Sequence, residues 1–155
     1  MSEQKKKMKL AEGLLLRADL IKKIDHLQNR IRPVLIVSND RVPQEDPNKL
    51  LAQLRNAILE LETLVVRINK TNNETYIEGE GLLMEALAKR DALKMLSEKL
   101  RNIRYAAQVN NTGDTELKTT IDIKKLQIEM DQTGRAFREL DSKIQEANWL
   151  TELKE

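Results

Sequence analysis

The chain has 155 residues, with 27 lysines and arginines, 25 aspartates and glutamates, one histidine, no cysteine and 3% aromatic residues. One core suffices at this length, and the shortage of cysteine and histidine excludes disulfides, thiolate or histidine metal clusters and Ser-His-Asp catalysis. The net charge of +2 gives no strong nucleic-acid signal, and no apolar run approaches about 18 residues, so we expect a cytoplasmic protein without transmembrane segment, metal or cofactor.

The first predicted helix covers residues 4–31, where leucine and isoleucine recur with a period near 3.6. Its apolar stripe consists of Leu10, Leu20, Ile24, Leu27 and Ile31, with Leu14 and Ile21 beside it. Pro33 ends the helix because the residue before a proline avoids helical backbone angles.

The second predicted helix covers residues 47–69. Asp46 is suited to cap it, and Pro47 stands at the first helical position, where a missing N–H costs nothing. Alternating spacings of three and four residues predict a heptad seam of Leu51, Leu54, Ile58, Leu61, Val65 and Ile68.

Two more helices are predicted over residues 81–108 and 122–150, the latter capped by Asp122. The apolar stripe of the third is Leu82, Ala86, Leu93, Leu96, Leu100, Ile103 and Ala107, and that of the fourth is Leu126, Met130, Phe137, Leu140, Ile144 and Ala147. Helices of about 25 residues are about 38 Å long. We therefore predict a mainly α protein, a single helical domain over residues 1–155, built as an elongated antiparallel four-helix bundle or coiled-coil-like assembly.

The connections between the helices contain short β-forming runs at residues 34–37, 76–77 and 117–121. In an up-down-up-down bundle the first and third connections lie at the same end. We expect a small β element, formed by these connections, to cap one end.

Charge is unevenly distributed along the chain. Residues 1–32 hold nine basic and four acidic side chains, whereas the connection over residues 71–81 holds Glu74, Glu78 and Glu80 without a base. These opposite charges favour head-to-tail or cross-subunit attraction, although each exposed pair contributes only about 0–1 kcal/mol.

The candidate residues for a polar site or an interface are Arg17, Asn69, Thr71, Asn72, Asp91, Asn148 and Trp149. Arg17 interrupts the first apolar stripe, where a carboxylate such as Glu62 or Asp91 could pair with it. The polar residues near the end of the second helix either bond the last carbonyls or form a binding patch. The tryptophan is a typical interface anchor.

Five blocks, residues 8–20, 45–47, 67–72, 85–93 and 140–149, resemble in that order the septicolysin-like family of small bacterial helical proteins. The resemblance implies an uncharacterised bacterial protein, and the family name implies a secreted pore-forming cytolysin. It supplies no catalytic residue. The helices themselves disagree with lysis, because charges cross every one of them and no export signal precedes them.

The function we expect is that of a non-enzymatic structural or interaction module that self-associates as a homo-oligomer. Two alternatives stay open: the membrane-active cytolysin that the family name implies, and a small-ligand-binding protein or unknown enzyme that uses polar residues near the helix ends.

Overall fold

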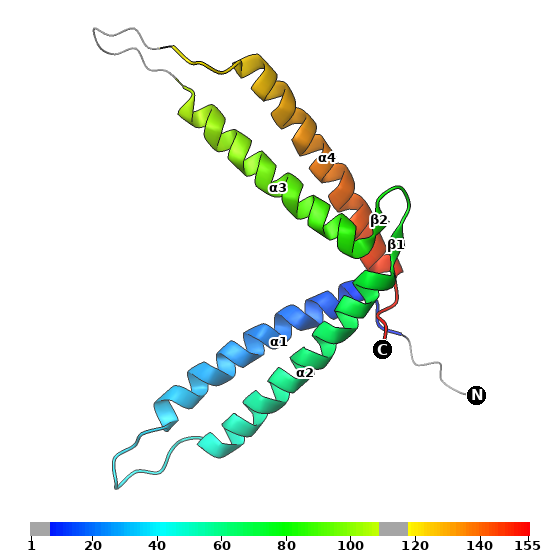
Figure 1. The fold of residues 1–155 in the computed structure, drawn as a ribbon. Coiled ribbons are helices and arrows are strands. Elements are labelled where there is room, and N and C mark those ends of the chain that lie inside the picture. The colour runs from blue at the N-terminus through cyan, green and yellow to red at the C-terminus, as the bar shows by residue number, and fades with distance from the viewer. Residues whose placement is uncertain (1–6, 109–117) are drawn as a thin grey trace, which may run out of the picture. The chain divides into compact units, whose positions relative to one another are not determined.

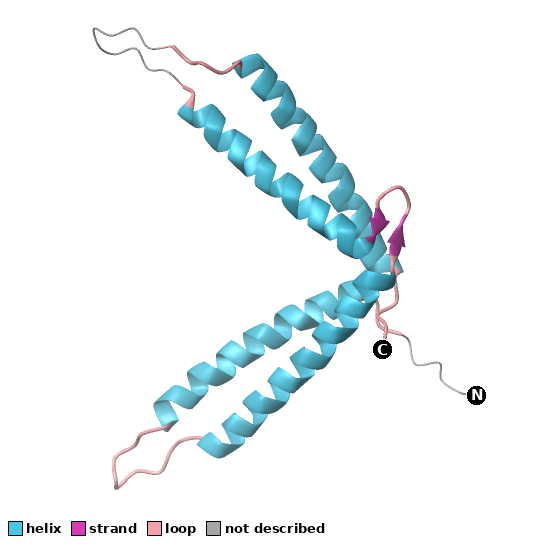
Figure 2. Ribbon diagram, in the orientation of Figure 1, coloured by secondary structure: helices cyan, strands magenta, loops and turns pink. Residues whose placement is uncertain are grey.

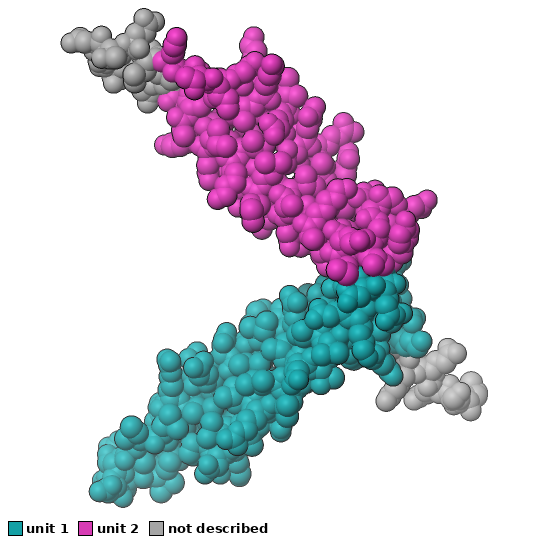
Figure 3. Space-filling view, viewed as in Figure 1, with its two compact units in different colours: residues 1–75, 148–155 teal, residues 76–147 magenta. Residues whose placement is uncertain are grey.

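The computed structural model describes residues 7–108 and 118–155. The protein is mainly helical, with one two-stranded antiparallel sheet (Figures 1 and 2). It contains two compact units, residues 1–75 together with 148–155, and residues 76–147 (Figure 3). The single domain expected from the sequence stays a prediction, because the compactness of each unit does not decide whether the two fold together.

The first unit begins with helix α1 (Leu10–Ile31), followed by the short 3-10 helix η1 (Arg32–Val34). The Glu12 carboxylate accepts a hydrogen bond of 2.7 Å from the backbone N–H of Lys9, so α1 starts at Leu10. The prediction placed this start at residue 4. Residues 4–6 lie outside the described residues, and Lys9 is extended because it pairs with Glu152 in an antiparallel β-bridge.

Helix α2 (Pro47–Glu74) starts as predicted, with the Asp46 carboxylate accepting a bond of 2.9 Å from the N–H of Asn48. It ends five residues beyond the predicted end at 69. The polar residues interpreted as a stop signal lie inside the helix instead, where Thr71 is buried and its hydroxyl donates to the Arg67 carbonyl at 2.8 Å.

Helices α1 and α2 form a hairpin whose core follows one stripe on each helix. The buried side chains are Leu10, Ala11, Leu20, Leu27 and Ile31 of α1 and Leu50, Ala57, Leu64, Ile68 and Thr71 of α2. The predicted seam of α2 is wrong at Ile58, which is 47% exposed, whereas the preceding residue, Ala57, is buried. The helix carries two neighbouring apolar stripes of the same period, so period alone could not choose between them.

The second unit begins with strands β1 (Tyr76–Ile77) and β2 (Gly81–Leu82), which pair antiparallel with Tyr76 opposite Leu82. Both Gly79 and Gly81 have positive φ, 78° and 88°, which glycine adopts without strain and which allows this tight hairpin. The β element thus forms within the second connection. The predicted strand at residues 76–77 is confirmed as β1, whereas those of the first and third connections were wrong: residues 35–37 and 118–121 form no strand, and residue 117 lies outside the described residues.

Helices α3 (Leu83–Ala106) and α4 (Ile123–Leu150) pack beside each other in this unit, with the Arg90 guanidinium 3.8 Å from the Asp141 carboxylate (Figure 1). The predicted stripe of α4 is confirmed at Leu126, Leu140 and Ile144, which are buried. That of α3 is wrong at Leu96 and Ile103, which are exposed. Within residues 7–108 and 118–155, no helix is long and apolar enough to cross a membrane.

Candidate functional site

The most extensive polar arrangement in the first unit fastens a C-terminal strap, residues 151–155, to the hairpin. The N–H of Leu10 donates to the Thr151 carbonyl at 2.9 Å, and the N–H of Leu153 donates to the Met8 carbonyl at 2.8 Å. The side chain of Leu153 is buried against Gly13, where an added Cβ would lie 3.0 Å from it. Leu153 is therefore the strap residue that packs into the core, whereas Glu152, Lys154 and Glu155 are exposed.

Thr71 is the centre of this arrangement on α2. Its side chain is 0% exposed, and its hydroxyl accepts a bond of 3.0 Å from the N–H of Lys154 while donating to the Arg67 carbonyl. The Arg67 Nε in turn donates to the Lys154 carbonyl at 2.9 Å. The hydroxyl is therefore satisfied inside the protein, and its contacts are those of a structural residue.

The other predicted site residues of the first unit differ widely in exposure. Arg17 and Asn69 are exposed, Asn72 is half-buried, Asn148 is 7% exposed and Trp149 is 57% exposed. No ion pair among the described residues includes Arg17.

The remaining candidate, Asp91, belongs to the second unit, where its carboxylate lies 2.7 Å from the Arg90 guanidinium. Arg90 also reaches Asp141 across the helices, a partner that the sequence analysis missed. Asp91 is exposed, so this pair lies at the surface.

Two acidic side chains of the connection between α2 and α3, Glu74 and Glu80, form ion pairs with lysines of their own unit. Glu74 pairs with Lys154, whose hydrogen bond holds the pKa of that carboxyl below its ordinary value. Glu80 lies 2.8 Å from Lys143 and 2.7 Å from Lys89, and these two hydrogen bonds lower its pKa to about 2. The cross-subunit attraction predicted for this connection is therefore not needed to neutralise these two carboxylates.

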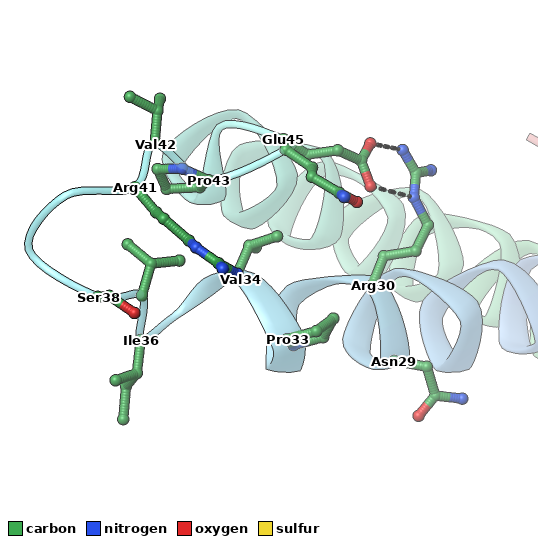
Figure 4. A pocket seen from close by; sticks show the side chains of 12 residues that line it. Asn29, Arg30, Pro33, Val34, Ile36, Ser38, Arg41, Val42, Pro43 and Glu45 are labelled. Carbon is green, nitrogen blue, oxygen red and sulfur yellow. Dashed lines mark hydrogen bonds and ion pairs between the residues drawn. The ribbon is translucent and has the colours of Figure 1, made fainter.

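A hollow of about 1020 Å³ lies at the tip of the first hairpin, between the end of α1 and the start of α2 (Figure 4). Arg30 and Glu45 pair across it, which raises the pKa of the guanidinium and lowers that of the carboxyl. The side chains of Ile36 and Val42 turn outward and are 90% and 88% exposed (Figure 4). Arg41 also lines the hollow.

A second apolar stripe, beside the buried one, runs along α2. We call it the second seam: Leu51, Arg55, Ile58, Glu62 and Val65, at spacings of four and three residues. Leu51 and Val65 are half-buried, and the other three are exposed. Because neighbouring residues of a helix are rotated by about 100°, this seam is about 100° around α2 from the buried stripe through Ala57.

Helix α1 adds to the same surface. In an antiparallel helix pair, equivalent heptad positions lie on the same side of both helices. Leu14 and Ile21 of α1 follow the stripe residues Gly13 and Leu20, just as Ile58 follows Ala57. Leu14 is half-buried and Ile21 exposed, so one side of the hairpin presents apolar side chains from both helices.

Large exposed apolar faces on helices mark interaction sites. Within the part of the chain that the structure describes, no three histidine, aspartate or glutamate side chains are grouped to hold a metal ion. Ile58 was predicted to lie in the heptad seam of the second helix, so this exposed stripe was not identified from the sequence. The signal was the second apolar stripe itself, offset by one residue.

Comparison with known proteins gives a family and a fold relative. A model described as "Family of unknown function (DUF6847)" matches residues 17–153. The crystal structure of a functionally unknown conserved protein from Corynebacterium diphtheriae is similar, with a TM-score of 0.87 and 29% sequence identity over 96% of this chain and 99% of that chain. No curated protein matches.

These matches correct the resemblance drawn from the sequence. The five blocks resembled septicolysin-like proteins, but the matching family is a different one and its function is unknown. The resemblance rested on short helical strings, which recur in unrelated helical proteins because heptad spacing constrains their composition. The cytolysin alternative falls with it.

Proposed function

Because this chain belongs to the family of unknown function DUF6847, we propose its role from its own surface: a non-catalytic, self-associating structural or interaction module. In this proposal the first hairpins of two copies pack together with coiled-coil-like packing and form a homo-oligomer. The cytoplasmic location expected from the sequence belongs to the same proposal.

The observation that carries the proposal is the second seam. A hairpin of two helices buries one stripe on each helix, and a helix at the corner of a four-helix bundle needs a second stripe, rotated by about 90°, for its other neighbour. The rotation of about 100° between Ala57 and Ile58 meets this requirement. Ile58 at 47% exposure and Ile21 at 45% leave apolar area for a partner to cover.

The absence of catalysis is the second part of the proposal. It is supported by Thr71, the most buried candidate, whose hydroxyl donates to the Arg67 carbonyl and accepts from the Lys154 N–H and so has its partners inside the protein. A catalytic site needs groups that converge on one reacting atom.

Light scattering coupled to size-exclusion chromatography, at low micromolar concentration, tests the self-association. We expect an oligomer for the wild type and a monomer of unchanged helicity for Ile58→Asp. The matched control is Ile128→Asp, because Ile128 is also exposed, at 56%, but belongs to α4. Its oligomeric state should equal that of the wild type. A wild-type protein that is strictly monomeric would refute the proposal.

A second candidate function, binding of a small anionic ligand, is favoured by the hollow at the hairpin tip. Arg41 lines this hollow, whereas the charge of Arg30 is neutralised by Glu45. A ligand that binds only the folded state raises its melting temperature. We therefore expect small anions to shift the wild type and not Arg41→Ala. Equal shifts for both proteins, or none for either, would remove this candidate.

A further inference from the structure

We infer that the second copy docks antiparallel on α2, with Arg55 of one copy against Glu62 of the other and the two Ile58 side chains near a two-fold axis. This arrangement rests on the proposed self-association and states which residues determine its geometry.

The second seam is self-complementary when it is reversed. If two α2 helices cross antiparallel at Ile58, residues whose numbers sum to about 116 or 117 lie at the same height. Leu51 then meets Val65, Ile58 meets Ile58, and Arg55 meets Glu62. Apolar side chains thus oppose apolar ones, and each of the two symmetric charge pairs joins opposite signs.

The same charges oppose a parallel arrangement. In parallel register Arg55 would face Arg55 and Glu62 would face Glu62, and juxtaposed like charges at an interface are destabilising. Both side chains are exposed, and neither forms an ion pair among the described residues. Their charges are therefore available to select the orientation of the partner.

The occupant that this chemistry selects is a second copy of the chain. An isologous interface uses the same patch on both subunits and must be self-complementary. The charge order of the seam, positive before negative with Ile58 between, meets that condition. An unrelated helix would need the same charge order by chance.

Charge reversal tests the register. We expect Arg55→Glu and Glu62→Arg each to raise the dissociation constant of the dimer about tenfold or more at low salt, because each places like charges together twice per dimer. The double variant, which exchanges the two charges, should return it to near the wild-type value. Far-UV circular dichroism checks that helicity is unchanged.

Cross-linking supplies a second test, which the absence of native cysteine makes clean. Asn48 and Asn69 are both exposed and their numbers sum to 117. We expect a mixture of Asn48→Cys and Asn69→Cys chains to be joined by a short bismaleimide, while each variant alone is not. The control is Gln53→Cys, exposed on the opposite side of α2, which should not link to Asn69→Cys.

The outcomes separate the two proposals. A wild-type dimer that responds to charge exchange and cross-links as described supports the antiparallel arrangement. A dimer that neither charge reversal weakens, or that links Gln53→Cys instead, overturns the arrangement and leaves self-association standing. A wild-type monomer overturns both.

Discussion

Replacing Thr71 with valine tests whether the strap is held by this buried hydroxyl. Valine has nearly the same shape as threonine, so the change creates no cavity and removes only the polar atom. The hydroxyl accepts from the N–H of Lys154 at 3.0 Å in a partly buried position. Without it, that N–H loses its acceptor within the strap, which costs about 1–3 kcal/mol.

The other bond of the hydroxyl contributes little to this difference. It donates to the Arg67 carbonyl one turn back, and such bonds within a helix are slightly destabilising, so their loss adds no cost. In a protein of this size each kcal/mol corresponds to about 2–4 °C in melting temperature. We therefore expect Thr71→Val to lower the melting temperature by about 2–12 °C and to increase hydrogen exchange at the Lys154 amide.

Thr63 provides the matched control for this experiment. Its hydroxyl donates to the Leu59 carbonyl at 3.0 Å on the exposed side of the same helix, but it accepts no bond from the strap. Thr63→Val should therefore change the free energy of unfolding by less than about 0.5 kcal/mol, as exposed substitutions usually do. If Thr71→Val and Thr63→Val had equal effects in urea denaturation, the account of the strap would be wrong.

Three further substitutions have defined outcomes. The folded-state pKa of Glu80 is about 2, against an ordinary 4.5, so its ion pairs stabilise the protein above about pH 4.5 and are lost between pH 4.5 and 2. Glu80→Gln should therefore flatten the loss of stability in that pH range, measured by thermal unfolding against pH. Leu153→Ala should cost about 2–5 kcal/mol in urea denaturation, whereas Leu150→Ala, at a side chain 69% exposed, should cost less than about 0.5. Asp46→Ala removes the cap of α2 and should cost about 1 kcal/mol by the same measurement, an effect that an unchanged midpoint would contradict.

The second seam gives a physical reason for a hairpin protein to self-associate. A two-helix hairpin has a large surface for its volume, so it buries a smaller share of its apolar side chains than a thicker bundle does. Exposed residues such as Ile21 and Ile58 are the consequence. Pairing of two hairpins would remove this area from water at roughly 25 cal/mol per Å².

Local signals in the sequence were sufficient for several elements. Asp46 and Pro47 predicted the start of α2, because a cap and an N-terminal proline act on their own turn. The predicted end of α1 at residue 31 is confirmed, although Arg32 before Pro33 keeps helical backbone angles and the chain continues as the 3-10 helix η1. The stripe of α4 was correct at Leu126, Leu140 and Ile144, since that helix offers one apolar stripe and no competitor.

The candidate site was harder to predict, because it depends on which side of a helix is covered. Thr71 was identified, but its structural role depends on Lys154, which is 83 residues away and not a partner that spacing indicates. Glu62 was considered only as a partner of Arg17. Its place beside Arg55 and Ile58 on an exposed face followed only once Ala57 was found in the core.

The amino-acid sequence by itself determined that the chain is mainly helical, where its helices approximately lie and that their faces are apolar with a heptad period, since these properties arise from neighbouring residues. The tertiary structure alone decided that Ala57 and not Ile58 enters the hairpin core, that Gly79 and Gly81 fold a β-hairpin, and that residues 151–155 pack beside α1 and α2. The physical reason is that burial and long-range hydrogen bonds depend on which segments meet in space, and two stripes of equal period are distinguished only by the surface that covers one of them.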